Sequence, residues 1–91
     1  MVSQLELHIV SLLKEGDKRA IPIIYENYSA SLLGVIQKII KDEAMAQDVL
    51  QETFIKVWRY AKKYDEKKAK LFPWLYWNGM LKGHEWMTKI K

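Results

Sequence analysis

The run from Glu43 to Tyr60 constrains most strongly what this chain can fold into. It contains neither glycine nor proline, and its hydrophobic residues recur at spacings of three and four. That spacing places them on one stripe of an α-helix, whereas a half-buried strand would alternate every second residue. The inward stripe consists of Ala46, Val49, Leu50, Thr53, Phe54 and Val57. Asp42 precedes the run and is a favourable N-cap, so we predict a helix that starts at Glu43.

Similar helical spacing occurs before and after this run. A first helix is expected from Ser3 to Glu15, because Gly16 is a suitable C-terminal stop. Asp17 is expected to cap the next helix, and Pro22 is tolerated there only near the first turn, which favours a start close to Ala20. Further helices are predicted over 32–40, after a break at Ser29 and Ser31, and from about Leu71, where Pro73 falls in the first turn.

Composition supports an all-helical domain. The chain has 91 residues, 49% of them hydrophobic, and only four glycines and two prolines. A chain of this length is one domain with enough apolar residues for a core, and so few breakers favour helices over strands and turns. We therefore predict an all-α fold over residues 1–91, a compact bundle of four to five helices, and a monomer.

Charge is distributed unevenly along the chain. Residues 1–55 carry five basic and eight acidic side chains, while residues 56–91 carry ten basic and three acidic ones. A lopsided small domain suggests two surfaces with different partners. The basic part would attract a polyanion, and the acidic part would suit a basic protein.

One group of polar residues lies on the outward side of the predicted helix over 43–60. Asp48, Gln51 and Glu52 stand at positions i, i+3 and i+4, so their side chains share a face opposite the apolar stripe. Carboxylates beside a carboxamide make an acceptor surface for Arg and Lys of another protein. The alternative is an ordinary solvated helix face, and the spacing alone favours that alternative.

A second group combines lysines with aromatic residues. Lysines neutralise phosphates without reading sequence, and exposed aromatic rings are surfaces on which unpaired bases stack. In the alternative interpretation the aromatics close the core and the lysines are solvated. Four aromatics within six residues cannot all point inward from one helix, so we expect some to be exposed. The lysines are Lys62, Lys63, Lys67, Lys68 and Lys70, and the aromatics are Tyr60, Tyr64, Phe72, Trp74, Tyr76 and Trp77.

The sequence gives no support for catalysis, a metal site or a cofactor. It has no cysteine, and its two histidines, His8 and His84, are far apart without a second ligand at metal spacing. No Gly-rich phosphate loop, catalytic triad or paired-carboxylate arrangement is present. The N-terminus has no signal-peptide pattern and no apolar run is long enough to span a bilayer, so we expect a cytoplasmic protein without a membrane partner.

The sequence D-E-A-M-A-Q-D-V-L-Q-E-T-F-I-K-V-W over 42–58 resembles region 2 of the sigma-70 family, of the extracytoplasmic-function type. Gly16-Asp17 with I-Y-E-N-Y at 24–28, upstream, and F-P-W-L at 72–75, downstream, are similar to the same family. The resemblance covers about residues 9–76. It implies a non-enzymatic role in transcription initiation, with core RNA polymerase and promoter DNA as partners.

The resemblance also implies roles for individual residues. Those implied to bind the coiled coil of the polymerase β′ clamp are Asp48, Gln51 and Glu52, and we add Phe54. Those implied to hold the unpaired non-template strand at the minus-ten element are Tyr60, Lys62, Lys63, Lys67, Lys68, Lys70 and Trp74, and we add Trp77 and Lys82. Lys89 and Lys91 would add general affinity for DNA.

The last helix departs from the family pattern. Met80 and Leu81 stand where the family usually has Arg and Asn, and Gly79 and Gly83 are expected to weaken the helix by about 1 kcal/mol each. One alternative is therefore an interaction module that binds polymerase or an anti-sigma factor without specific promoter recognition. Another is a general nucleic-acid-binding domain unrelated to polymerase. The family's second DNA-binding domain has no counterpart in these 91 residues, so we expect an isolated or truncated region 2.

Overall fold

Helices account for every regular element of the computed structural model, which describes residues 3–90 apart from the side chains of Trp86, Lys89 and Ile90. No strand occurs in that range, so the all-α prediction is confirmed. Four α-helices and one 3₁₀ turn follow each other along the chain. They are α1 (Gln4–Glu15), α2 (Ala20–Gln37), α3 (Glu43–Arg59), the 3₁₀ turn η1 (Ala61–Lys63) and α4 (Leu71–Ile90).

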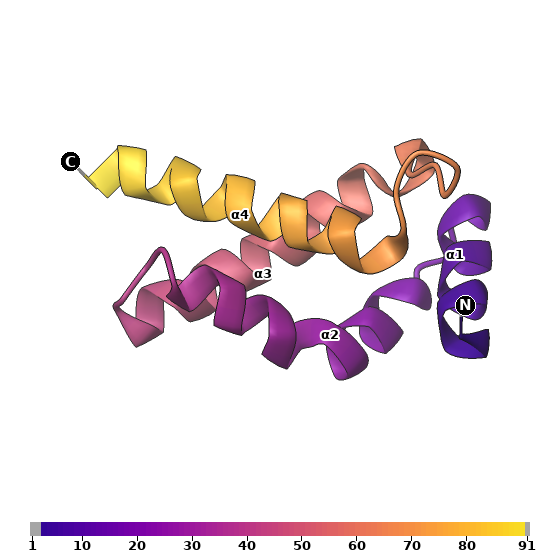
Figure 1. Cartoon of the computed structure of the whole chain (residues 1–91), viewed down its shortest axis with the longest axis horizontal. Coiled ribbons are helices and arrows are strands. Elements are labelled where there is room, and N and C mark those ends of the chain that lie inside the picture. Colours follow the sequence, from indigo (N-terminus) through magenta and orange to yellow (C-terminus); the bar gives the residue numbers. More distant parts are fainter. Residues whose placement is uncertain (1–2, 91) are drawn as a thin grey trace.

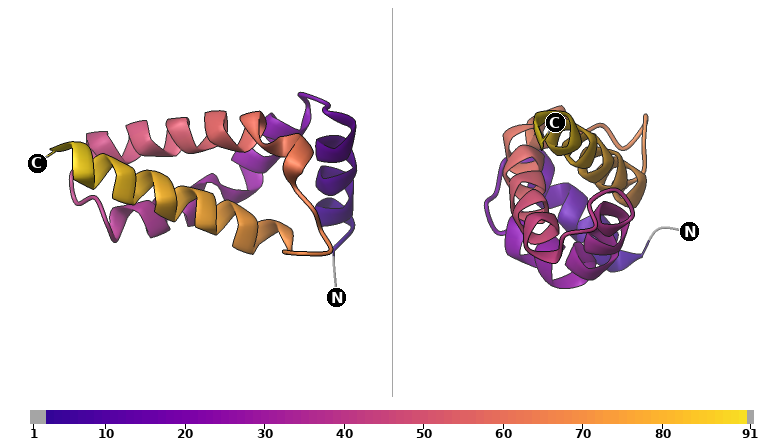
Figure 2. Two further views of the ribbon diagram at one scale, coloured as in Figure 1. Left: turned by 90° about the horizontal axis from the view of Figure 1, so that it is seen from above. Right: turned by 90° about the vertical axis from the view of Figure 1, so that its left-hand side faces the viewer.

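The three long helices form the body of the molecule, and α1 lies across one end of it (Figures 1 and 2). α2 and α3 are joined by a short connection and pack against each other, and α4 packs against both. α1 contacts the start of α2 and η1. The loop between η1 and α4 therefore lies at the end of the bundle that α1 covers (Figure 1).

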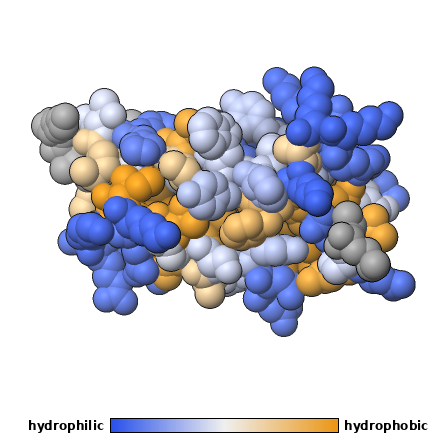
Figure 3. Space-filling model, in the orientation of Figure 1, coloured by the Kyte–Doolittle hydropathy of each residue, from blue (hydrophilic) through white to orange (hydrophobic). Residues whose placement is uncertain are grey.

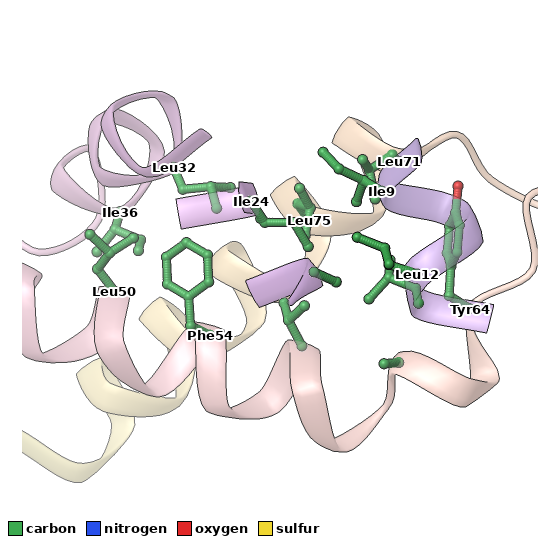
Figure 4. Packing of buried hydrophobic residues seen from close by; sticks show 14 of the residues in the cluster. Ile9, Leu12, Ile24, Leu32, Ile36, Leu50, Phe54, Tyr64, Leu71 and Leu75 are labelled. Carbon is green, nitrogen blue, oxygen red and sulfur yellow. The ribbon is translucent and has the colours of Figure 1, made fainter. Parts of the chain in front are cut away.

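The core extends through the whole bundle and includes α1 (Figure 4). Ile24 of α2 and Leu75 of α4 are fully buried near its middle, and Ile9 and Leu13 of α1 are fully buried at its end. Each fully buried aliphatic side chain contributes roughly 1.5–3 kcal/mol of transfer free energy. The N-terminal helix is thus part of the folded unit rather than an appendage.

The helix ends follow the expected capping chemistry. The Ser3 hydroxyl accepts a hydrogen bond from the Glu6 backbone N–H at 3.1 Å, and Asp42 Oδ1 accepts one from the Met45 N–H at 2.9 Å. Gly16 ends α1 in the left-handed region at φ 68°, where only glycine is unstrained. The predicted boundaries of the first helix and of the helix starting at Glu43 are confirmed.

α2 differs from the prediction, because no break occurs at Ser29 or Ser31. The buried residues Ile24, Leu32 and Ile36 lie at multiples of four along one stripe, and the two serines fall beside that stripe. Apolar packing on this face therefore stabilises one continuous helix, because the two serines are only mildly unfavourable in a helix interior.

Asp17 also behaves differently from the prediction, since it does not cap α2. Its carboxylate accepts hydrogen bonds from the Arg19 backbone N–H at 2.9 Å and from Arg19 Nη2 at 2.6 Å. These bonds close the turn that precedes the helix, and they lower the pKa of Asp17 to about 2. The start of α2 at Ala20 agrees with the constraint that Pro22 imposes.

Gly79 and Gly83 have a packing role that the sequence interpretation missed. Both are buried on the inward face of α4. A Cβ atom at Gly79 would lie 3.8 Å from Ile36 Cγ1, and one at Gly83 would lie 3.1 Å from Ile39 Cδ1. The distance at Gly79 is an ordinary contact, whereas Gly83 lets α4 approach Ile39 more closely than a larger residue would allow, so close packing accounts for Gly83.

Candidate functional site

The outward side of α3 separates into two edges. Burial of Val49 and Thr53 on the inward face turns Asp48 and Gln51 to the surface, where both are exposed. Gln51 lines a groove between α3 and α2, whereas Glu52 is half-buried and lines a pocket between α3 and α4. Asp48, Gln51 and Glu52 therefore all lie on the outward side of α3, as predicted. Gln51 faces the groove beside α2, whereas Glu52 faces the pocket beside α4.

Phe54 lies on the inward face of α3, with only 7% of its surface exposed. Its ring packs against Tyr25 of α2, with 5.2 Å between the ring centroids and an interplanar angle of 51°. Phe54 also lines the groove between α2 and α3. The contact with polymerase expected for this residue stays a prediction.

The groove between α2 and α3 is largely apolar and has a volume of about 720 Å³. Ile55 and Tyr25, on opposite walls, are 59% and 48% exposed. The sequence interpretation missed this feature, although an isoleucine on the outward side of a helix, beside Glu52, was a signal for it. The full lining is Lys18, Ile21, Pro22, Tyr25, Gln51, Phe54, Ile55 and Trp58.

The pocket between α3 and α4 is polar and has a volume of about 520 Å³. Lys82 forms an ion pair with Glu85 at 3.5 Å. Burial, together with the nearby charge of Lys82, lowers the pKa of Lys56 below its usual range. The pocket joins Lys82, which the sequence predicted, to Lys56 and Arg59, which it did not. Its lining is Glu52, Ile55, Lys56, Arg59, Tyr60, Lys82 and Glu85.

The basic loop is exposed and anchored at its base. In Figure 3, hydrophilic atoms gather over the loop between α3 and α4, at the upper right. Glu66 forms an ion pair with Lys14 of α1, and Asp65 Oδ1 accepts a hydrogen bond from the Lys67 N–H at 2.9 Å. The five predicted lysines all lie on the surface, namely Lys62, Lys63, Lys67, Lys68 and Lys70.

The aromatic residues near this loop divide into exposed and buried ones. Tyr60 is exposed, and the Lys63 ammonium lies 5.5 Å from the centre of its ring. Tyr64 instead closes the core, because it is only 6% exposed and packs against Trp74 with 4.8 Å between the ring centroids. Trp74 is half-buried, and Trp77 is 58% exposed. Some aromatics are exposed, as the helix geometry required.

Tyr64 also carries a buried hydroxyl that finds no hydrogen-bond partner among the residues that the structure describes. Burial raises its pKa to about 12, and the carboxylates of Glu6, Glu66 and Asp65 contribute to the shift. The ring closes the core between α1 and α4 and is a structural element of the site (Figure 4).

The first two turns of α4 carry few polar side chains at their surface. Asn78 is buried, and its side-chain N–H donates to the Trp74 carbonyl at 2.9 Å. Trp77 and Leu81 are exposed instead, one helical turn apart. The side chain of Lys89, and Lys91 as a whole, lie outside the described residues.

Neither a metal site nor a membrane span emerges from the described residues. They contain no group of three or more His, Cys, Asp or Glu side chains that could hold a metal ion. None of the helices found there has both the length and the apolar character needed to cross a bilayer.

Comparison with known proteins identifies the family. Residues 24–79 match sigma-70 region 2. The chain is 33% identical over 76 residues to the RNA polymerase sigma-H factor of Pseudomonas aeruginosa, a match that covers 84% of this chain and 39% of that protein.

Other relatives belong to the same group. The chain is 27% identical over 60 residues to the ECF RNA polymerase sigma factor SigK of Mycobacterium ulcerans, covering 66% of this chain and 32% of that protein. The SigK protein of Mycobacterium tuberculosis is 25% identical over 59 residues, covering 65% of this chain and 32% of its own length. The chain thus spans roughly a third of the length of these relatives, and no solved structure matches it significantly. From the matched residues and the similarity to the sigma-H factor, this chain belongs to the sigma-70 region 2 family.

Proposed function

We propose that this chain acts in transcription initiation as a sigma region 2 domain, which binds core RNA polymerase through α3 and single-stranded promoter DNA through the basic loop and α4. The observation that carries the proposal is the outward face of α3. Asp48 and Gln51 are exposed there, on a rigid helix fixed by its buried stripe. Acceptors held in this way suit the Arg and Lys side chains of the β′ clamp coiled coil.

Support for the DNA part comes from the loop after η1 and from α4. The lysines of the loop are exposed, and Lys63 lies over the ring of Tyr60. Trp77 is exposed on α4, and Lys82 lines the polar pocket together with Tyr60. Cations would hold the phosphates, while the exposed rings would stack on unpaired bases, for roughly 1–3 kcal/mol per base. In this proposal the polymerase carries out the chemistry, and the domain supplies binding energy.

Charge reversal on α3 tests the polymerase part. We expect Asp48→Lys and Glu52→Lys each to weaken binding to core RNA polymerase by tenfold or more, on the order of the cost of breaking a charged interface contact. The circular dichroism spectrum should remain helical. Glu15→Lys is the matched control, because Glu15 is exposed in the last turn of α1 and lies on another surface. Unchanged affinity of both α3 variants would overturn the proposal.

Salt dependence tests the DNA part. Titration with a minus-ten non-template oligonucleotide should quench the tryptophan fluorescence at low salt. Neutralising Lys67 and Lys68 together to Gln should lower the salt slope of binding by about one to two, since each phosphate contact contributes roughly 0.7 for single strands. Lys41→Gln serves as the control, because Lys41 is exposed between α2 and α3. If no oligonucleotide quenches the tryptophan fluorescence at low salt, the proposed binding of DNA is wrong.

A second candidate is an interaction module that binds polymerase or an anti-sigma factor without selecting a promoter sequence. The outward face of α4 favours it, because Trp77 and Leu81 are exposed while Asn78 is buried. Apolar and aromatic surfaces bind without reading hydrogen-bond patterns. Equal affinity for a minus-ten oligonucleotide and for a scrambled one of the same composition would favour this candidate, whereas at least tenfold discrimination would favour the first.

A further inference from the structure

The polar pocket between α3 and α4 gathers cations from both helices. Lys56 and Arg59 come from α3 and Lys82 comes from α4, and the three line one hollow of about 520 Å³. The two helices pack directly against each other, so the fold holds both walls in place (Figure 1). Two of the cations are recessed, since Lys56 is half-buried and the side chain of Lys82 is only 20% exposed. Lysine is rarely withdrawn from water, so two recessed ammonium groups in one hollow are unusual for a merely solvated surface.

The carboxylates of the pocket do not neutralise it. Glu85 forms an ion pair with Lys82 at 3.5 Å, and Glu52 is the other acid of the lining. Three cations against two carboxylates leave a net positive charge. Burial and the charge of Lys82 lower the pKa of Lys56, and Glu85 offsets only part of that shift. A bound anion would relieve the repulsion between the two ammonium groups, because it places negative charge beside both.

The kind and number of the donors indicate which anion fits. Ammonium and guanidinium groups make short, charge-assisted hydrogen bonds to phosphate oxygens. A terminal phosphate offers three such oxygens to the three cations and carries about 1.5 to 2 negative charges at neutral pH. A phosphate inside a nucleic-acid strand carries about one charge and has a sugar on either side, so it reaches exposed cations more readily than recessed ones. The pocket therefore suits a terminal phosphate better than the backbone of a strand.

The α3 wall of the pocket also carries an aromatic ring. Glu52, Lys56 and Tyr60 stand at positions i, i+4 and i+8, so they form one row. Tyr60 lines the pocket, is 39% exposed, and lies about 6 Å beyond Lys56 along the helix axis. Nucleobases stack on such rings. A volume of about 520 Å³ is also within the range of small-molecule sites, roughly 300–1,000 Å³.

We propose that the pocket between α3 and α4 binds a free nucleoside di- or triphosphate, with its terminal phosphate held by Lys56, Arg59 and Lys82 and its base against Tyr60. The inference goes beyond the proposed function, because it adds a small-molecule ligand and does not depend on the binding of polymerase. Tyr60 and Lys82 also belong to the residues proposed to hold DNA, so a nucleotide in the pocket and a strand on these two side chains exclude each other.

Titration calorimetry of the chain with ATP at low salt tests the phosphate half of the site. We expect one molecule of ATP to bind per chain, and Lys56→Gln and Lys82→Gln each to weaken binding by about tenfold or more, because each removes a charge-assisted contact. Lys38→Gln is the matched control, since it removes the same charge from an exposed position at the end of α2. Its affinity should stay within twofold of the parent protein. Thermal melts would verify that all three variants fold.

A second comparison tests the base half of the site. Tyr60→Leu should weaken the binding of ATP by about fivefold or more, because stacking is lost, and should leave the binding of inorganic tripolyphosphate within twofold. Adenosine, which has no phosphate, should not bind measurably. Equal affinity of the parent protein and of Tyr60→Leu for ATP would mean that no base lies against this ring, and the assignment to a nucleotide would be wrong.

The remaining outcomes also have definite meanings. If the parent protein does not bind ATP, the inference is wrong. If Lys56→Gln and Lys82→Gln bind ATP as tightly as Lys38→Gln does, the nucleotide is held elsewhere by general charge, and the inference is again wrong. If the two pocket variants lose affinity only for the minus-ten oligonucleotide, the pocket belongs to the DNA, so the inference fails while the proposed function stands. Tighter binding of a phosphoserine peptide than of ATP would assign the pocket to a phosphorylated protein instead.

Discussion

Gly83 on α4 faces Ile39, the second residue after α2, so closely that a Cβ atom would lie 3.1 Å from Ile39 Cδ1. Gly34, in the last turn of α2, has nothing within 4 Å of its own Cβ position. We expect Gly34→Ala to raise the free energy of unfolding by about 0.5–1 kcal/mol, because alanine is the better helix former. Gly83→Val should lower it by about 2 kcal/mol, since its methyl groups would overpack the contact with Ile39. Urea denaturation followed by circular dichroism measures both.

Gly79→Ala distinguishes close packing from simple helix weakness at these glycines. Its Cβ would lie 3.8 Å from Ile36, an ordinary contact, so this variant should be at least as stable as the parent protein. A stabilising effect of Gly83→Val similar to that of Gly34→Ala would contradict the close approach of α4.

Lys56 is held in the polar pocket near the like charge of Lys82, and burial lowers its pKa. We expect Lys56→Met to raise the free energy of unfolding by about 0.5 kcal/mol at neutral pH, because the partly desolvated charge is removed while the apolar stem is kept. Thermal unfolding at pH 7 is the measurement. Lys41→Met is the control, because Lys41 is exposed.

The pH dependence of the Lys56 effect has a definite sign. A folded pKa below the unfolded value of 10.5 means that, as pH rises, the native state releases this proton before the unfolded state does. Stability conferred by this group therefore increases with pH, and the advantage of Lys56→Met should shrink towards pH 10.5. An advantage that grows with pH would be inconsistent with the shift.

Tyr64 has a buried hydroxyl without a partner among the described residues, so the hydroxyl is a cost to the fold. We expect Tyr64→Phe to raise the free energy of unfolding by up to about 1 kcal/mol. Tyr64→Ala should lower it by about 3 kcal/mol, because a cavity opens beside Trp74. Chemical denaturation of both variants tests this, and a loss of more than about 1 kcal/mol in Tyr64→Phe would mean that the hydroxyl has a partner.

The dependence of stability on pH in the alkaline range gives a second measurement on Tyr64. The pKa of Tyr64 in the folded state, about 12, lies above its ordinary value of 10.0, so the unfolded state releases the proton first and stability falls between these two pH values. Tyr64→Phe should show a shallower fall than the parent protein over the same interval. Identical slopes would show that Tyr64 does not titrate differently in the two states.

Asp17 contributes stability through its bonds to Arg19, which lower its pKa to about 2 from 3.8. For a carboxylate with a depressed folded pKa, that contribution is complete above pH 3.8 and disappears as pH falls towards 2. We expect Asp17→Asn to melt at a lower temperature than the parent protein at pH 7. The difference should vanish across this acid window and should shrink in high salt, since the pair is exposed. A difference independent of pH would point to the side-chain shape rather than its charge.

The sequence predicted the helices well where periodicity and caps agreed. The stripe from Ala46 to Val57 and the caps at Ser3 and Asp42 appear in the structure as expected. The break expected at the two serines of α2 failed, because local propensity is worth only tenths of a kcal/mol per residue and the buried stripe outweighs it. Local signals could not show how close α4 comes to Ile39, and so the packing of Gly83 against that residue was missed.

The candidate site was predicted in part. Exposure of Asp48, Gln51 and the loop lysines follows from helix geometry and solvation, both of which are local properties. The division of α3 into an apolar groove and a polar pocket depends on which helix packs at each side of it, and no spacing within α3 reveals that. Burial of Tyr64 is likewise a property of the tertiary contact with α1 and Trp74.

The position of α1 bears on how much of the protein is needed for an independent unit. The residues that match the family begin at position 24, yet Ile9 and Leu13 are fully buried and Lys14 ties α1 to the loop at Glu66. A fragment trimmed to residues 24–79 would leave the apolar end of the bundle open to water and the lysine-bearing loop without its support. The smallest piece that keeps its shape therefore extends upstream to about Ser3, well before the recognisable family pattern begins.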